Sequence, residues 1–250
     1  MKKMLSIKTT KLLTGVEIKG DYEDLNAIYD ALSNVVGEEG YYKEYEPCSL
    51  RIMGLCYEIR HAYQGDRKKS KSNDSARYYS FNYLWPELIF VAAVLSDFIS
   101  IAESGKCYLN DPSVEFFRED TRQLLIDNLP NNISLLRYFQ GLILNELRRV
   151  IGSKRSDKIR ELTKIEYSIF RMQYNDKYCT QMIDILNIKY LKRNPERRVT
   201  YLATITQKIL EPDYEYENLK EAVLEYAKED EIPYYRVMLE GMNYPDDIEW

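Results

Sequence analysis

The sequence contains a single histidine, His61, among its 250 residues. One imidazole excludes any metal site that draws several histidines from one chain, including the two-histidine zinc motifs. The four cysteines form no CxxC pair, so a zinc ribbon is excluded as well. We therefore predict neither a bound metal nor a cofactor.

The loops that bind phosphate groups in many enzymes are also absent. The ten glycines form neither GxxxxGK[ST] nor GxGxxG, and there is no GxSxG turn to present a nucleophilic serine. No complete catalytic motif is present, which favours a non-enzymatic protein. Catalysis by the single histidine remains the alternative hypothesis.

Long apolar runs are scarce. The longest strongly apolar run extends from Leu88 to Ser96, whereas a membrane-spanning helix needs about 20 such residues. The first residues lack the apolar region of a signal peptide. We therefore predict a cytoplasmic protein without membrane contact, with reduced and buried thiols at Cys48, Cys56, Cys107 and Cys179.

Tyrosine, by contrast, is abundant, with 23 residues, and charge is unevenly distributed. The tyrosines fit either the rim of a core or an interaction surface, where tyrosine is favoured. Residues 141–200 hold 14 Lys or Arg and 7 Asp or Glu, a net charge of +7, whereas residues 211–250 hold 3 and 13, a net charge of −10. These regions either pack together, or provide a basic groove for a nucleic-acid backbone or an acidic end for a basic partner.

Periodicity predicts mostly helices after a short β element. Residues 5–8 and 15–19 alternate as two strands, and Tyr78 to Trp85 is either a strand or an extended approach to a helix. Residues 67–77 are expected to form an exposed, mobile loop, and Pro130 to break a helix. The expected helices cover residues 21–37, 49–65 (with a strand open over 55–63), 86–103, 111–128, 132–152, 156–172, 178–192, 195–210, 218–228 and 234–239.

The predicted fold class is therefore mainly α (α+β), a small N-terminal β-hairpin followed by a multi-helix bundle. We expect an N-terminal α+β module with a buried central helix over residues 1–105 and a helical bundle over 106–250. One continuous domain remains the alternative.

The only histidine lies in a charged segment that precedes a run of aromatic residues. His61 and Asp66 are the candidate catalytic pair, because imidazole titrates near neutral pH. The structural alternative is a helix end, with cations near its C-terminal dipole and Gly65 as its stop. Candidates for binding a ligand or partner are His61 together with Arg60, Tyr63, Gln64, Arg67, Asn82, Trp85 and Glu87.

Two strings of this region resemble a family of bacterial proteins known only as a domain of unknown function. They are Arg51 to Arg67, RIMGLCYEIRHAYQGDR, and Tyr79 to Glu87, YSFNYLWPE. The likeness includes the LTG and GDY strings near the N-terminus and so covers about the first hundred residues. It implies a bacterial, phage or mobile-element origin and no particular activity.

Two functional hypotheses follow. The first is a non-enzymatic interaction or accessory protein that binds a protein partner through tyrosine-rich and oppositely charged helical surfaces. The alternative is a nucleic-acid-directed enzyme or binder that uses His61 and the basic segment 148–160. Its candidate nucleic-acid contacts are Arg148, Arg149, Lys154, Arg155, Lys158 and Arg160.

Overall fold

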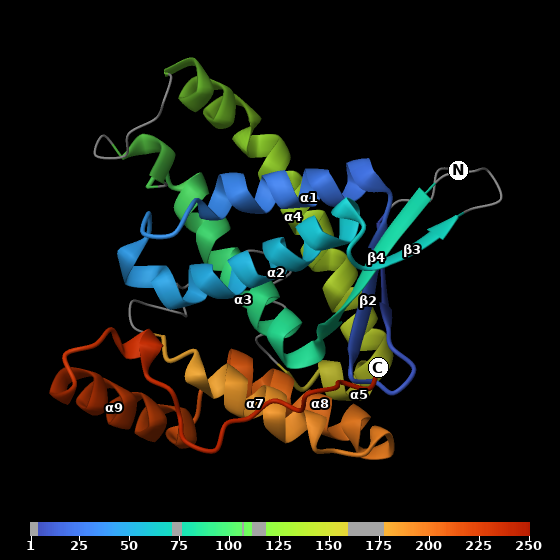
Figure 1. Ribbon diagram of the computed structural model, residues 1–250, viewed down its shortest axis with the longest axis vertical. Helices are drawn as coiled ribbons and strands as arrows, with labels where there is room; N and C mark the ends of the chain where they lie inside the picture. Colours follow the sequence, from blue (N-terminus) through green and yellow to red (C-terminus); the bar gives the residue numbers. More distant parts are fainter. Residues whose placement is uncertain (1–4, 72–76, 107, 112–118, 160–177) are drawn as a thin grey trace.

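The N-terminal residues form the predicted β-hairpin. In the computed structural model, β1 (Ser6–Thr9) pairs antiparallel with β2 (Gly15–Gly20). The structure describes residues 5–71, 77–106, 108–111, 119–159 and 178–250 (Figure 1). Most of the helix predicted over residues 156–172 lies outside these ranges, as do Cys107 and Arg160.

The hairpin is half of a larger sheet. β4 (Arg77–Leu84) pairs with β2, and β3 (Lys68–Lys71) pairs with β4, which gives an antiparallel sheet of order β1-β2-β4-β3. The strand interpretation of the run from Tyr78 to Trp85 is therefore correct up to Leu84, whereas Trp85 begins the following helix. The loop predicted over 67–77 is wrong at residues 68–71 and 77. Exposed lysines resemble a loop in sequence, but they are also what protects an edge strand from further pairing.

The predicted mainly α fold is confirmed, because helices form most of the described chain. Capping and stop residues in the sequence predict where several of these helices begin and end. Asp21 and Asp24 form a capping box, in which the Asp24 amide donates to Asp21 Oδ1 at 2.9 Å. The helices are α1 (Tyr22–Val36), α2 (Glu46–Gln64), α3 (Trp85–Glu103), α4 (Glu119–Ile151), α5 (Ser153–Ser156), α7 (Gln181–Leu191), α8 (Pro195–Leu210) and α9 (Tyr214–Glu229), with 3-10 turns η1 (Lys43–Tyr45), η2 (Tyr108–Asn110) and η3 (Tyr234–Arg236).

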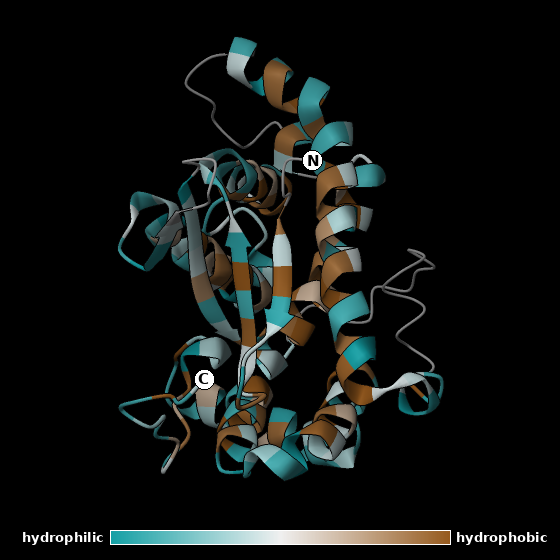
Figure 2. Cartoon of the chain, turned by 90° about the vertical axis from the view of Figure 1, so that its right-hand side faces the viewer, coloured by the Kyte–Doolittle hydropathy of each residue, from teal (hydrophilic) through white to brown (hydrophobic). Residues whose placement is uncertain are grey.

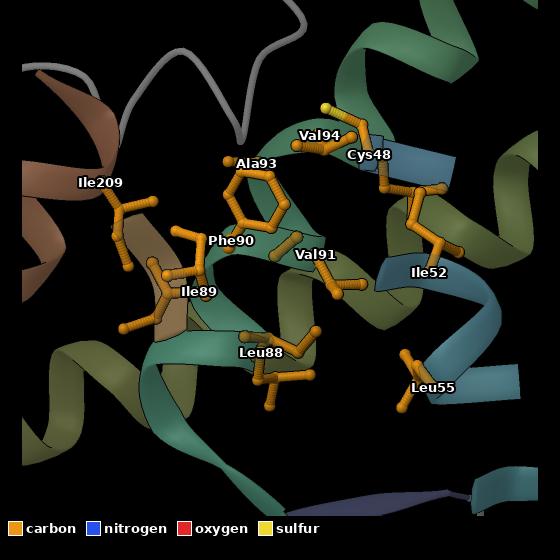
Figure 3. Close-up of a cluster of buried hydrophobic side chains, with 14 of the residues drawn as sticks. Cys48, Ile52, Leu55, Leu88, Ile89, Phe90, Val91, Ala93, Val94 and Ile209 are labelled. Carbon is orange, nitrogen blue, oxygen red and sulfur yellow. The ribbon is translucent and has the colours of Figure 1, made fainter. Parts of the chain in front are cut away.

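Helix α3 is the central, buried helix that the sequence predicts. Nearly all of its side chains are buried, and Figure 3 shows those from Leu88 to Val94 between Ile52 of α2 and Ile209 of α8. By length and composition alone, the stretch Trp85–Asn110 is apolar enough to cross a membrane, but 78% of its most apolar window is buried inside the structure. This burial is the pattern of a core helix.

Helix α4 continues through Pro130, which corrects the predicted break at this residue. The proline removes one backbone hydrogen bond, to the carbonyl of Ile126, but it lies on an exposed side of the helix where water can satisfy that carbonyl. Along α4, hydrophilic and hydrophobic residues alternate in Figure 2. The two helices predicted over 111–128 and 132–152 are thus one helix within the described residues.

The C-terminal helices form a layer below the N-terminal ones, and the chain then returns to the sheet. Figure 1 shows α7, α8 and α9 along one side, with α9 farthest from the strands. The final segment crosses back, and Thr14 Oγ1 donates to the Glu249 carbonyl at 2.5 Å. One cluster of buried apolar side chains includes residues from Leu5 to Val237, so both parts of the chain contribute to a single core.

Candidate functional site

The candidate catalytic pair lies at the C-terminal end of α2. Gly65 ends this helix with a positive φ of 93°, which only glycine adopts readily, and the turn brings Asp66 back to the last helical residues. His61 Nδ1 lies 2.9 Å from Asp66 Oδ2. The imidazole ring packs against the Tyr57 ring, with 4.2 Å between the ring centroids. Because both partners come from one helix end, the pair also serves to stabilise that end.

Five of the eight predicted binding residues, His61 among them, do not line the cavity that the other three share. The Arg60 guanidinium lies over the Tyr57 ring, and Gln64 is exposed. Tyr63 packs edge-on against Tyr22 and Tyr29. Trp85 is fully buried in the core, and its Nε1 has no hydrogen-bond partner among the described residues.

The structure brings Asp66, Arg67, Asn82 and Glu87 to one cavity of about 610 Å³, which we call the β4 pocket. The Gly65 turn and the antiparallel pairing of β3 with β4 place the first three, and Pro86 in the first turn of α3 fixes Glu87 after the strand. The remaining lining residues are Glu58, Lys68, Ser80, Phe81, Tyr83, Leu84 and Trp250.

Trp250 reaches the β4 pocket because Gly15 has no side chain. A Cβ at position 15 would lie 2.8 Å from the indole and would also overlap the Tyr83 carbonyl oxygen. The pocket wall is thus formed by segments from opposite ends of the chain.

Glu87 connects the β4 pocket to a polar network that joins α2, α3 and α7. Arg51 Nη1 donates to Glu87 Oε2 at 3.1 Å, and both of its Nη atoms donate to Asp184, at 3.0 and 2.5 Å. Asn187 Nδ2 also donates to Glu87 Oε2, at 2.8 Å, and the Tyr244 hydroxyl donates to Asp184 at 2.9 Å. One guanidinium therefore serves two carboxylates.

Burial raises the pKa of Glu87 above its ordinary value, although Arg51 and the Asn187 hydrogen bond act in the opposite direction. Its side chain is only 13% exposed. Burial also raises the pKa of Tyr83 well above its usual range, with the Glu87 charge as the second cause. The β4 pocket therefore contains a carboxyl that holds its proton more tightly than an exposed glutamate does.

Sequence reasoning missed Arg51, Asp184, Tyr83, Tyr244 and Trp250. Arg51 and Asp184 lie 133 residues apart, and no motif marks either, so a single sequence offers no signal for their contact. In the parts of the chain that the structure describes, no three His, Cys, Asp or Glu side chains gather as they would around a metal ion.

The basic segment 148–160 is partly neutralised. Arg149 donates twice to Glu146, at 2.7 and 2.6 Å, and Arg155 Nη1 donates to the Ile151 carbonyl at 3.2 Å. Lys154 and Lys158 are exposed, as is the Arg155 side chain. Arg148 also has interactions, and Arg160 lies outside the described residues.

The acidic C-terminal region presents one ordered surface on α9. Its buried side consists of Tyr216, Val223 and Ala227. The opposite side carries three exposed glutamates at successive i, i+4 positions, which we call the α9 acidic stripe: Glu217, Glu221 and Glu225.

The amino-acid sequence matches one family model over nearly its whole length. That model, described as Domain of unknown function (DUF6904), covers residues 5–250, and the chain belongs to this family. The likeness seen in the first hundred residues therefore extends through the helical remainder, which is wider than expected. Neither a curated protein nor a solved structure matches the chain.

Proposed function

We propose that this member of the DUF6904 family is a non-enzymatic accessory protein that holds a protein partner with a basic surface, and that the α9 acidic stripe is its contact. One observation carries the proposal. Glu217, Glu221 and Glu225 are exposed in a row, and none has an ion pair among the residues that the structure describes.

The α9 acidic stripe lowers the stability of the protein when no partner is bound. Like charges at i, i+4 spacing destabilise a helix by roughly 0.2–0.5 kcal/mol per pair. The N-terminus of the same helix, by contrast, is capped. Its N-cap Asp213 accepts a hydrogen bond from Lys208 Nζ at 2.8 Å and another from the Glu215 amide at 3.0 Å. A basic partner would relieve the repulsion within the stripe.

Exposed rings flank the α9 acidic stripe. Tyr214 is 72% exposed, and Tyr226 is 50% exposed. Tyrosine contributes large apolar area with a polar tip, and it is enriched at protein interfaces. Carboxylates beside exposed rings suit a lysine- or arginine-rich protein surface.

A nucleic-acid binder is the second candidate, favoured by Lys154, Arg155 and Lys158, which are exposed close together after α4. It has weaker support, because Glu146 already neutralises Arg149. Gel shifts at increasing salt concentration test this candidate, since phosphate contacts produce a steep salt dependence.

Co-purification with a charge-neutralised variant tests the main proposal. Wild-type protein and the Glu217→Gln, Glu221→Gln, Glu225→Gln triple variant are each tagged and used to capture partners from native lysate at low and high salt. We expect a partner that wild type captures at low salt and that the triple variant loses. Its capture should weaken at high salt, because exposed ion pairs are screened.

A matched control changes the net charge equally at a different place. Glu38→Gln, Glu39→Gln and Glu44→Gln neutralise three exposed carboxylates before α2, and this variant should retain the partner. If no captured protein distinguishes the two triple variants, the α9 acidic stripe is not a partner site.

A further inference from the structure

The β4 pocket has the size and the construction of a small-molecule site. Its volume of about 610 Å³ lies within the range of roughly 300–1,000 Å³ that such sites occupy. Its walls come from the end of α2, from β3 and β4, from the first turn of α3 and from Trp250. It lies at the sheet, whereas α9 lies on the far side of the molecule in Figure 1, so this inference does not depend on the proposed partner.

Among the charged groups around the β4 pocket, Asp66 and Lys68 balance each other, and the remaining groups leave one negative charge in excess. Arg51 gives both Nη atoms to Asp184 and only one of them to Glu87, so one positive charge faces two carboxylates. Arg67, which also lines the pocket, donates to both oxygens of Glu58, at 2.8 and 2.9 Å. Both guanidinium groups are therefore already engaged by carboxylates, which disfavours an anionic ligand.

Glu87 is oriented so that one oxygen stays available. Its Oε2 atom accepts from Arg51 and Asn187, whereas Oε1 has no hydrogen-bond partner within the described ranges of the chain. Because Oε2 is fixed by two donors, the free oxygen is held in place at the pocket wall. A ligand N–H would pair with this oxygen without displacing an existing bond.

The other walls are aromatic. Tyr83 and Trp250 line the β4 pocket with Phe81, whose ring contacts that of Tyr83 edge-on. Aromatic faces attract cations and also cover the apolar body of a ligand. The combination of a surplus carboxylate charge and aromatic walls selects a positive group on an apolar frame.

We infer that the β4 pocket binds a small organic cation, with an ammonium group at Glu87 Oε1 and an apolar body against Tyr83 and Trp250. Lys68 is the one lining cation of the described chain without an ion pair, and it is exposed on the edge strand. It repels a cationic ligand only weakly, because water screens it.

The two tryptophans allow a direct test. Trp85 is fully buried, whereas Trp250 lines the β4 pocket, so Trp85→Phe leaves a single fluorescent reporter at the site. The probes are 2-phenylethylamine, its uncharged counterpart 2-phenylethanol, and 3-phenylpropanoate as the anion. We expect a saturable change of Trp250 fluorescence with the amine, and at least tenfold weaker binding of the alcohol and the carboxylate.

Amino-acid substitutions test whether the amine binds at Glu87. Glu87→Gln should weaken amine binding at least tenfold, Lys68→Gln should strengthen it slightly, and Glu44→Gln, outside the pocket, should leave it unchanged. If Trp85→Phe does not fold, titration calorimetry of the same probes with otherwise wild-type protein replaces the fluorescence. Equal binding of amine and alcohol, preferred binding of the carboxylate, or amine binding that Glu87→Gln leaves intact would each overturn the inference.

Discussion

At the scale of single residues, Glu87 and Glu146 differ in the number of donors they receive. Glu87 shares Arg51 with Asp184, so burial dominates and raises its pKa. Burial acts in the same direction on Glu146, but the Arg149 and Thr9 hydrogen bonds outweigh it and lower the pKa to about 2. The charge on Glu146 therefore stabilises the fold, whereas the charge on Glu87 opposes folding.

Glu87→Gln should change how stability depends on pH. A carboxyl whose pKa is raised by folding stabilises the folded state below its ordinary value of 4.5, and this contribution is lost as the pH rises through the folded-state pKa. The groups that face it are Arg51 on α2, Asp184 and Asn187 on α7, Tyr83 on β4, and Tyr244. Urea unfolding at several pH values should show the stability of the variant increasing relative to that of wild type as the pH rises above 4.5. A difference that stays constant or reverses would contradict this.

Glu146→Gln should destabilise the protein by roughly 2 kcal/mol at neutral pH, because the lowering of the pKa from 4.5 to about 2 is discounted for solvent screening of the exposed Arg149. This carboxylate accepts from the Thr9 amide at 2.6 Å and so satisfies the edge strand β1. In wild type the contribution is present above pH 4.5 and disappears as the pH falls towards 2. Denaturant titrations measure both effects, and the exposed Glu44→Gln serves as control. A loss below ~1 kcal/mol would refute the assignment.

At the scale of secondary-structure elements, sequence signals worked where they were local. The Asp21 capping box, the Gly65 stop and the Pro195 start of α8 each depend on residues within one turn of the helix, and each helix end lies where the sequence predicts. β3 was mispredicted, because exposed polar residues occur in loops and in edge strands alike. The course of α4 through Pro130 was also mispredicted, because a proline can either end a helix or be tolerated within it.

Pro130→Ala should stabilise the protein by about 1–2 kcal/mol. The alanine restores an amide donor to the Ile126 carbonyl, and part of this gain is offset by the greater freedom of the unfolded chain. The residue is exposed, so no core contact is lost. Thermal and urea unfolding measure the change, and a destabilised variant would show that the proline fits a bend that the fold requires.

At the scale of the whole molecule, contacts between distant segments assemble the β4 pocket and its polar network. Asp66, Arg67, Asn82 and Glu87 were each candidates from the sequence, but the β3–β4 pairing that brings them to one pocket was not predicted, because residues 67–77 were expected to form a loop. The approach of Trp250 was not predicted either, because it depends on packing at Gly15. The same holds for other contacts of the hairpin turn, such as Tyr190 with the Leu13 carbonyl and Arg198 with Thr14.

The predicted division into two modules between residues 105 and 106 stays a prediction. The buried core contains residues from both sides of this boundary. Buried side chains of α1 and α3 belong to the same apolar cluster as those of α4, α7 and α8. A core shared in this way favours folding as one cooperative unit.

Partner capture by the single variant Glu221→Lys tests the central claim most directly. A lysine between Glu217 and Glu225 replaces two repulsive i, i+4 pairs with attractive ones, so α9 should become more stable by about 1 kcal/mol. The same charge reversal should abolish capture of the partner. A more stable protein that no longer captures the partner is the predicted result, whereas a stable variant that captures it as well as wild type does would contradict the proposed function.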